Sequence, residues 1–304
     1  MARVLDGAEI SAQIKKEVAA EVKRLAAQGI RPGLAAVLVG HVPASQIYVR
    51  SKVQTCEELG LYSDLITPDE DVTTEDMMEL VAGLNDRDDI DGILIQLPLP
   101  KQVDTKALLD RVLPEKDVDG FHPVNAGKLQ AGRPGLTPCT PAGMIEILDR
   151  SAIPIQGQHA VVVGRSDIVG KPVAMLLLNR HATVTICHSK TRDLGAVTRE
   201  ADILVAAVGR AGFITPDMVK PGVTILDVGI NRVTDPAEFE RFFAGNGKRA
   251  ETFVKRGSTL VGDVHPKAYE VAAAYTPVPG GVGPLTIAML MANTVRAAKM
   301  RRGL

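Results

Sequence analysis

The chain has 304 residues, of which 45% are apolar, and a formal net charge of -1 at pH 7. This length suffices for about two domains with hydrophobic cores. Lysine and arginine number 35 against 36 aspartate and glutamate residues, so no charge excess favours nucleic acid or an anionic membrane as partner. No apolar run reaches the ~18 residues of a membrane span, and the first residues lack a signal-peptide core. Three widely spaced cysteines indicate no disulfide framework, so a reducing cytoplasm is the expected compartment.

The first half of the chain is expected to alternate helices and strands. Apolar spacing predicts a helix from Glu9 to Gln28, and GLAAVLVG at 33–40 predicts a buried strand. A second helix is expected from Ala44 to Leu59, ending at Gly60. The remaining predictions here are a strand at 62–66, a helix at 74–84 capped by Thr73 or Thr74, and a strand at 91–97.

Three polar residues in this half suit a site. Tyr48 and Lys52 are four residues apart, so both project from one face of their predicted helix. Gln96 ends a predicted strand, and an open α/β sheet binds its ligands outside the carboxyl ends of its strands. A solvated lysine beside a half-buried tyrosine, and a glutamine bonded to nearby loop backbone, explain the same residues without a ligand.

Two loops rich in proline and polar residues follow, at 113–121 and 136–141. Loops of this kind on a rigid scaffold often carry function. They also serve as rigid connectors, with Asp119 capping a turn before Gly120. Both interpretations remain open at this point.

The stretch HAVVVGRSDIVGKPVAMLLLN at 159–179 is typical of a nucleotide site. A short β-branched run is followed by Gly164 and Gly170, which bracket a turn before an apolar helix. A phosphate fits on such a helix N-terminus, where N–H groups lack partners and the helix dipole is positive. The spacing is G-x-S-x-x-x-G rather than G-x-G-x-x-G. An ordinary strand-to-helix turn punctuated by glycine is the alternative.

The second half continues a βαβ rhythm, which predicts a doubly wound sheet. A linking helix is expected at 141–150, and the elements after it are strand 160–163, helix 171–179, strand 182–187, helix 194–201, strand 203–208 and strand 223–228. An NAD site places an acidic residue after the second strand, for the ribose hydroxyls. Here the chain has CHSKTR at 187–192, and such hydroxyls and cations suit a 2′-phosphate, so NADP is favoured. Arg165 offers a planar fork for the same phosphate, although Arg165 and Lys190 also fit as solvated turn residues.

Residues 235–258 interrupt that rhythm. The segment holds four of the six phenylalanines, and Phe239, Phe242 and Phe243 predict an accessory helix that covers apolar surface and ends at GNG, 245–247. A strand at 259–261 and a glycine and proline cluster at 276–284 follow, before a last helix at 285–299. Dense glycine permits close backbone approach to a planar ligand, but a hinge loop has the same composition.

Taken in order, several motifs resemble those of the bifunctional methylenetetrahydrofolate dehydrogenase/methenyltetrahydrofolate cyclohydrolase family. They are PASQIYVRSK at 43–52, GILIQLPLP at 92–100, KDVDGF at 116–121, PCTP at 138–141, GRSDIVGKP at 164–172, ATVTICHSKT at 182–191, GDV at 262–264 and TPVPGGVGPLT at 276–286. They span nearly the whole chain. One departure is Leu285, where the family commonly has Met, and this exchange conserves side-chain volume.

The resemblance implies two α/β domains. Residues 1–140 with 284–304 would form a folate-binding catalytic domain, and 141–283 a Rossmann-type NADP-binding domain with a doubly wound parallel sheet. The active site would lie in the cleft between them. The resemblance also implies tetrahydrofolate derivatives as substrates and a homodimer. No metal is expected, because His122, His188 and His265 lack the spacing of metal ligands.

Residue roles carry over at the matching positions. Lys52 would be the general acid/base, Gln96 would orient it, and Tyr48 would stack on the folate ring. Asp119 would bind the pterin edge, so these four form the expected catalytic set. The remaining expected contacts are Pro279, Gly280 and Gly283 for the folate, and Gly164, Arg165, Ser166, Gly170, Ser189 and Ile230 for the cofactor.

The chemistry makes this division of labour reasonable. Removal of a hydride from the methylene group between two nitrogens leaves a cation that both nitrogens stabilise. The dehydrogenase step therefore needs mainly positioning against the nicotinamide. Hydrolysis of the cation needs proton transfer, because water loses a proton and the departing nitrogen gains one. Lys52 is assigned to this cyclohydrolase step.

Two rival functions fit parts of the sequence. A two-domain dehydrogenase for an amino-acid or shikimate-like substrate predicts no cyclohydrolase activity and no role for Gln96. A nucleotide-sensing protein without catalysis requires loss of a motif residue, and Tyr48, Lys52, Gln96 and Asp119 are all present.

Overall fold

The computed structural model describes residues 2–41 and 43–304, and these divide into two compact units. Unit 1 contains the described residues up to Ile10 together with Thr140–Leu285, and unit 2 contains Ser11–Cys139 and Thr286–Leu304. Residues up to Ile10 belong to unit 1, rather than to the folate domain expected from the sequence, because Arg3 and Val4 pair with a strand of its sheet. Among the described residues, no helix has the length and apolar character that a membrane crossing requires.

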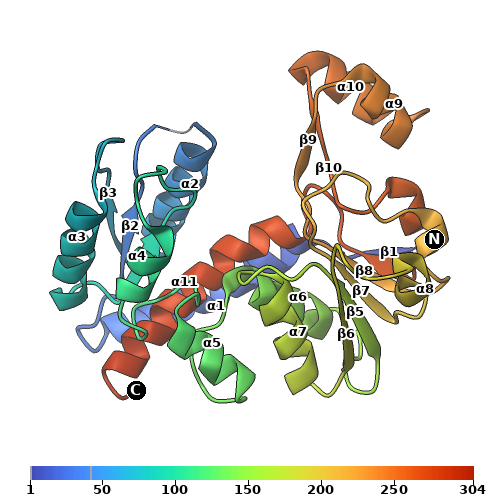
Figure 1. Ribbon diagram of the computed structural model, residues 1–304. Helices are drawn as coiled ribbons and strands as arrows, with labels where there is room; N and C mark the ends of the chain where they lie inside the picture. The colour runs from blue at the N-terminus through green and yellow to red at the C-terminus, as the bar shows by residue number, and fades with distance from the viewer. Residues whose placement is uncertain (1, 42) are drawn as a thin grey trace. The chain divides into compact units, whose positions relative to one another are not determined.

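Unit 2 is built on a small parallel sheet in the order β3-β2-β4. Strand β2 (Gly33–Val37) is buried along its whole length, between β3 (Tyr62–Ile66) and β4 (Gly92–Ile95). Apolar side chains on one face pack against α3 (Thr74–Asp86) and α4 (Thr105–Arg111) in one core. Figure 1 shows these two helices beside the sheet. The other helical segments assigned to this unit are most of α1 (Gly7–Ala26), α2 (Pro43–Leu59), α5 (Pro123–Gln130) and most of α11 (Val282–Arg301).

Unit 1 contains a six-stranded sheet whose pairings are all parallel, in the order β1-β11-β8-β7-β5-β6. Its strands are β1 (Arg3–Val4), β5 (His159–Val163), β6 (Thr183–Cys187), β7 (Ile203–Ala206), β8 (Thr224–Asp227) and β11 (Ala274–Tyr275). The helices α6 (Cys139–Arg150), α7 (Gly170–Asn179) and α8 (Leu194–Thr198) alternate with them. The chain passes from β5 to β6 on one side and then crosses back to β7, on the other side of β5. The carboxyl ends of β5 and β7 therefore form a topological switch point, where doubly wound sheets bind ligands.

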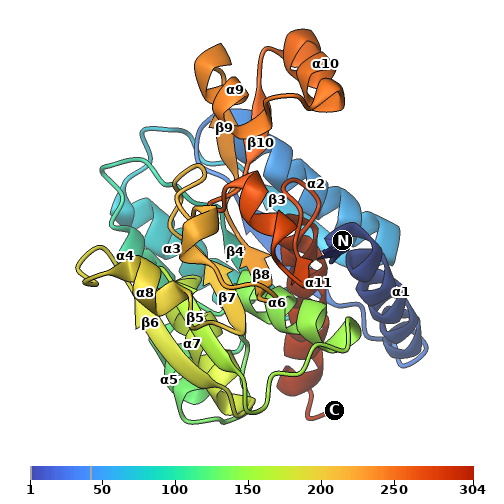
Figure 2. The same ribbon diagram turned by 90° about the vertical axis from the view of Figure 1, so that its right-hand side faces the viewer.

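An antiparallel hairpin of β9 (Asn231–Val233) and β10 (Thr259–Val261) extends from unit 1 and carries two helices at its end. Both views show α9 (Pro236–Phe243) and α10 (Gly247–Arg256) together beyond the hairpin (Figures 1 and 2). The phenylalanines of α9 are buried against Val233 and Val261, so the helix covers apolar surface as predicted. The prediction missed α10, which begins within GNG because the Asn246 side chain accepts a hydrogen bond from the Arg249 amide.

Other predicted bounds differ by a few residues. The strand expected at 33–40 ends at Val37, which pairs with Ile95, the last residue of β4, so one side of the ladder stops there. The last helix begins three residues before the predicted start, at Val282. Thr73, one of the two expected caps, forms a reciprocal capping box with Asp76.

Candidate active and cofactor sites

Three of the four expected catalytic residues interact in unit 2: Lys52 is hydrogen-bonded to Gln96, and its charge acts on Asp119. The Lys52 Nζ atom on α2 donates a hydrogen bond of 3.0 Å to Gln96 Oε1, just beyond β4. Gln96 Nε2 donates to the Leu97 carbonyl oxygen at 2.7 Å, so the backbone-bonding alternative also holds. This second bond fixes the side-chain amide with its oxygen toward the lysine. Tyr48 lies one turn before Lys52 and is 50% exposed, which leaves its ring available for a flat ligand.

Asp119 is half-buried and lies close enough to Lys52 for their charges to interact. The pKa of its carboxyl is raised to about 6, chiefly by burial; the nearby Lys52 charge opposes this shift and the Asp117 carboxylate adds to it. The expected alternative, in which Asp119 caps the turn before Gly120, is not what the structure contains. Asp117 does so instead, because its carboxylate accepts hydrogen bonds from the Phe121 and His122 amides.

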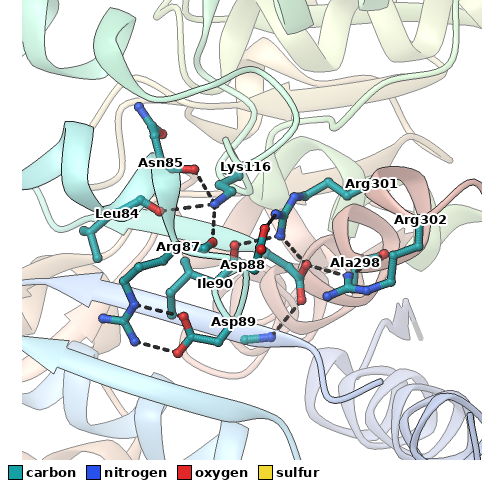
Figure 3. A network of polar contacts seen from close by, with 12 residues as sticks. Leu84, Asn85, Arg87, Asp88, Asp89, Ile90, Lys116, Ala298, Arg301 and Arg302 are labelled. Atoms are coloured by element: carbon teal, nitrogen blue, oxygen red, sulfur yellow. Dashed lines mark hydrogen bonds and ion pairs between the residues drawn. The ribbon is translucent and has the colours of Figure 1, made fainter. Parts of the chain in front are cut away.

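The segment that carries Asp119 is anchored by Lys116, whose side chain is only 1% exposed. Figure 3 shows its ammonium group donating to the carbonyl oxygens of Leu84, Asn85 and Arg87, at the end of α3. A cation at a helix C-terminus meets carbonyls that lack partners within the helix. Burial lowers the pKa of Lys116, and the nearby Arg301 guanidinium lowers it further. Lys116 therefore holds the start of KDVDGF in place.

Two asparagines complete this support. Asn125 donates to Asp117 Oδ2 at 2.8 Å and to the Pro114 carbonyl oxygen at 2.8 Å. Asn293, on α11, donates to the carbonyl oxygens of Val118 and Thr137, which bracket the Asp119 loop. The sequence did not predict either asparagine, because an isolated asparagine belongs to no motif. Lys116 and Asp117 lie inside the KDVDGF motif, but no role was predicted for them.

The turn after β5 in unit 1 has the shape that a dinucleotide phosphate requires. Gly164 has φ +129°, and a Cβ there would lie 2.2 Å from the Ala207 carbonyl oxygen, beyond β7. A Cβ at Gly170 would lie 2.3 Å from the Gly164 carbonyl oxygen. Only glycine fits at both positions, so the backbone closes tightly at the switch point. The Ser166 hydroxyl lies over the start of α7 and accepts from the amides of Val169 and Gly170.

Residues 188–192, which directly follow β6, include no acidic residue that could bind ribose hydroxyls. Ser189 and Lys190 are exposed there, and Arg165 is exposed beside Gly164. Among described residues, no carboxylate lies within 4.0 Å of the Arg165 guanidinium. These cations and hydroxyls fit an additional phosphate, so the donor set suits NADP.

Two buried carboxylates that sequence reasoning missed hold the neighbouring loops. Asp263 accepts from the amides of Val208, Gly209 and Arg210, after β7. Asp227 accepts from the amides of Gly229, Asp263 and Val264, and from the Tyr269 hydroxyl. Burial raises the pKa of Asp227 to about 6, although these donors oppose the shift. Asp263 lies in the GDV motif at 262–264, for which the sequence predicted no role.

The expected folate loop, Pro279 to Gly283, belongs to unit 1. A Cβ at Gly283 would lie 3.6 Å from Ile230 Cδ1, so an expected folate contact adjoins an expected cofactor contact. The loop is also packed against α1, because a Cβ at Gly7 would overlap the Gly281 carbonyl group. Pro279 is exposed and Gly280 half-buried. Within residues 2–41 and 43–304, no group of three His, Cys, Asp or Glu side chains is arranged to hold a metal ion.

A doubly wound domain with a glycine turn at its switch point is typical of nucleotide-binding enzymes, and the same chain contains a second unit that presents a lysine and an amide. Two family models match the chain. The tetrahydrofolate dehydrogenase/cyclohydrolase catalytic domain matches residues 5–119, and the NAD(P)-binding domain of the same family matches residues 138–302. The chain therefore belongs to the tetrahydrofolate dehydrogenase/cyclohydrolase family.

Full-length relatives agree with this assignment. The chain is 70% identical over 303 residues to the bifunctional protein FolD of Koribacter versatilis, and the match covers 100% of this chain and 99% of the relative. It is 59% identical to the FolD of Solibacter usitatus, with 100% and 99% covered. Among solved structures, FolD from Campylobacter jejuni matches with a TM-score of 0.90 and 42% identity, covering 99% of this chain and 100% of that one.

The FolD of Trypanosoma brucei, crystallised with NADP and an inhibitor, matches with a TM-score of 0.88 and 38% identity, over 100% and 99% of the two chains. The predicted fold class, the two linked activities and the NADP cofactor are thereby confirmed. The chain is a bifunctional methylenetetrahydrofolate dehydrogenase and methenyltetrahydrofolate cyclohydrolase with a tetrahydrofolate substrate.

Proposed function

We propose that the two activities divide between different residues, with Lys52 moving protons in the cyclohydrolase step and the dehydrogenase step relying on positioning. The observation that carries this proposal is the 3.0 Å hydrogen bond from Lys52 Nζ to Gln96 Oε1, with Asp119 in electrostatic contact. The chain oxidises 5,10-methylenetetrahydrofolate to the methenyl form and hydrolyses that to 10-formyltetrahydrofolate.

In the hydrolysis, water adds to the methenyl carbon and must lose a proton. We assign Lys52, held by its hydrogen bond to Gln96 Oε1, to accept that proton. The bond from the carbon to one nitrogen then breaks, Lys52 returns the proton to the departing nitrogen, and the hydroxyl group of the adduct loses its proton to solvent, which leaves the formyl group. Gln96 is the positioning residue, because its amide is itself fixed by the Leu97 carbonyl oxygen.

Asp119 and Tyr48 are assigned to the ring system of the substrate. A half-buried carboxyl suits the edge of a pterin, where neighbouring N–H groups can donate to both oxygens. The exposed Tyr48 ring suits stacking on a flat heterocycle. Pro279, Gly280 and Gly283 would contribute a loop without bulky side chains against the same substrate.

NADP, when bound, accepts a hydride from the methylene carbon. Gly164, Gly170 and Ser166 would hold its diphosphate, and Arg165 and Ser189 its 2′-phosphate. Ile230 would contact the cofactor where it adjoins Gly283. Preference for NADP over NAD would follow from the cations after β5 and β6.

The oligomer and the compartment are also part of this proposal. We infer a homodimer in the cytoplasm, without a nucleic acid or membrane partner. The balanced net charge argues against nucleic acid and anionic membranes as partners, and the three buried free thiols support the compartment.

The test is a spectrophotometric assay of the purified protein with methylenetetrahydrofolate and either cofactor. We expect methenyl formation with NADP, followed by its decay, and a lower kcat/KM with NAD. Equal rates with the two cofactors would contradict the assignment of Arg165 and Ser189. Decay of the methenyl product at the uncatalysed rate would contradict the role of Lys52.

A further inference from the structure

A cleft of about 660 Å³ lies in unit 1, between the α9–α10 insertion and the edge of the sheet formed by β1 and β11. We call it the insertion cleft. Its volume lies in the range of about 300–1,000 Å³ that is usual for small-molecule sites. No residue assigned to either reaction lines it, so it is separate from the site described above.

The charged side chains that line the insertion cleft are mostly cationic. Arg241, Arg249 and Lys267 line it, and Glu270 is the one acidic side chain among its lining residues. Within the part of the chain that the structure describes, no carboxylate lies within 4.0 Å of any of the three cationic groups. None of the three cationic groups therefore forms an ion pair with a described residue.

Arg249 is the most enclosed of these cations. Its guanidinium donates to Thr259 Oγ1, to the Leu260 carbonyl oxygen and, at 2.6 Å, to the Val278 carbonyl oxygen. These three acceptors are neutral, and burial lowers the pKa of Arg249. An arginine has five N–H donors, so at least two remain for a ligand. Arg249 is half-buried, and a cation that is partly withdrawn from water and has only neutral partners attracts an anion more strongly than a fully solvated one.

The walls of the insertion cleft are largely apolar. Phe243 lies under the Arg249 guanidinium, with 4.8 Å from the central carbon to the ring centroid. Phe242 and the stacked rings of Tyr269 and Tyr275 add further flat surface. A ligand that fits both the walls and the charges carries an anionic group on an apolar or ring-shaped body.

We propose that the insertion cleft binds a small organic anion with a flat apolar body, held by Arg249, Arg241 and Lys267. Val278 directly precedes the proposed folate loop. An anion that draws the Arg249 guanidinium toward itself weakens its bond to the Val278 carbonyl oxygen. Occupancy of the cleft then alters the loop at Pro279 to Gly283; this coupling rests on the proposed function, whereas the binding does not.

The binding is tested with 8-anilinonaphthalene-1-sulfonate, a fluorescent anion of this class, titrated into the full-length protein with saturating NADP so that the nucleotide site is filled. The matched neutral probe is N-phenyl-1-naphthylamine, which lacks the sulfonate. We expect Arg249→Gln to weaken binding of the anionic probe about tenfold, because one charge-assisted contact is lost. The neutral probe should change less than about twofold.

The control is Arg256→Gln, an exposed residue of α10 that does not line the cleft. Arg241→Gln and Lys267→Gln carry the test if Arg249→Gln lowers the Tm markedly, since each should weaken the anionic probe about threefold. Unchanged affinity for the anionic probe in these variants, or equal wild-type affinity for both probes, would overturn the proposal. Both enzyme activities are assayed without the probe, so failure of the proposed function is detected separately.

Discussion

The two units make their sites by different means. In unit 2, chemistry resides in side chains: an ammonium, an amide and a carboxyl from α2, the end of β4 and the KDVDGF loop. In unit 1, the site is mainly backbone. It is a turn so tight that a Cβ atom placed on Gly164 or Gly170 would lie less than 2.5 Å from another backbone atom. Reactivity in unit 2 depends on the functional groups of side chains, whereas binding in unit 1 depends on the absence of a side chain.

This comparison predicts opposite responses to substitution. Isosteric changes in unit 2 should remove activity and preserve the fold, whereas the smallest added group in the unit 1 turn should disturb the fold together with cofactor binding. The following predictions test the contrast, from the largest expected effect to the smallest.

Lys52→Met keeps the length and apolar stem of the side chain and removes its amine. We expect cyclohydrolase kcat to fall by roughly 10² to 10⁴, the usual contribution of general acid–base catalysis, with a smaller effect on dehydrogenase kcat. Separate assays of methenyl formation and methenyl decay measure the two. Loss of the dehydrogenase with retention of the cyclohydrolase would show the division of labour to be wrong.

Gly164→Ala adds one methyl group to the phosphate turn. Because its Cβ would meet the Ala207 carbonyl oxygen, we expect at least about 3 kcal/mol of destabilisation and a more than tenfold loss of NADP affinity. The control is Gly157→Ala, where φ is +77° but no atom lies within 4 Å of the new Cβ. It should cost about 1 kcal/mol, with NADP affinity unchanged. Equal effects at both positions would mean that backbone strain, not collision, sets the response.

Asp119→Asn tests the pH dependence of unit 2. The folded-state pKa of about 6 lies above the ordinary value of 3.8, so ionisation of Asp119 destabilises the fold above pH 6. The variant should be more stable than wild type there, by at most about 3 kcal/mol, and this advantage should vanish as pH falls from 6 to 4. Urea unfolding across this range measures it. Asp110→Asn, at an exposed position, is the control variant.

Deletion of 237–255 removes both insertion helices. Val233 and Val261, now buried, would be exposed, and we expect a loss of about 2 kcal/mol, measured as a fall in Tm. The deletion tests the accessory role predicted from the phenylalanines. If Tm, oligomeric state and NADP affinity all stay at wild-type values, that role is refuted.

Leu285→Met restores the residue that the family commonly has at this fully buried position. Because the exchange conserves volume and both side chains are flexible enough to repack, the free energy of unfolding should change by less than about 1.5 kcal/mol. Leu285→Ala is the contrasting variant and should cost about 2 to 5 kcal/mol. Similar Tm values for the two variants would contradict the close packing of Leu285 against Gly143.

Most of the fold could be predicted because it follows from local patterns. Strands such as β5 are short apolar runs, helices such as α3 begin at a capping residue, and glycines mark the turns. The second insertion helix escaped prediction because α10 is polar, and its contacts with α9 arise only in the folded chain, as between Phe253 and Phe239.

The site was predictable to the extent that its residues stand in motifs. Lys52, Gln96 and Asp119 came from spacing and family resemblance, and their proximity is present in the fold. Their supports were not predictable, since Asn293 lies 174 residues from Asp119 in the sequence and its two bonds to backbone depend on where α11 packs. Side chains that bond to backbone carry no sequence signature of their partner.

All three boundaries between the units fall inside helices: after Ile10 in α1, after Cys139 in α6 and before Thr286 in α11. This has a consequence during synthesis on the ribosome. Unit 1 has all its residues once Leu285 has been made, whereas unit 2 still lacks the segment that carries Asn293 and Arg301. The buried Asp91 carboxylate stays without its two arginine partners, Arg301 and Arg302, until that last segment has been made. Unit 2, most of which is synthesised before unit 1, is therefore expected to finish folding last.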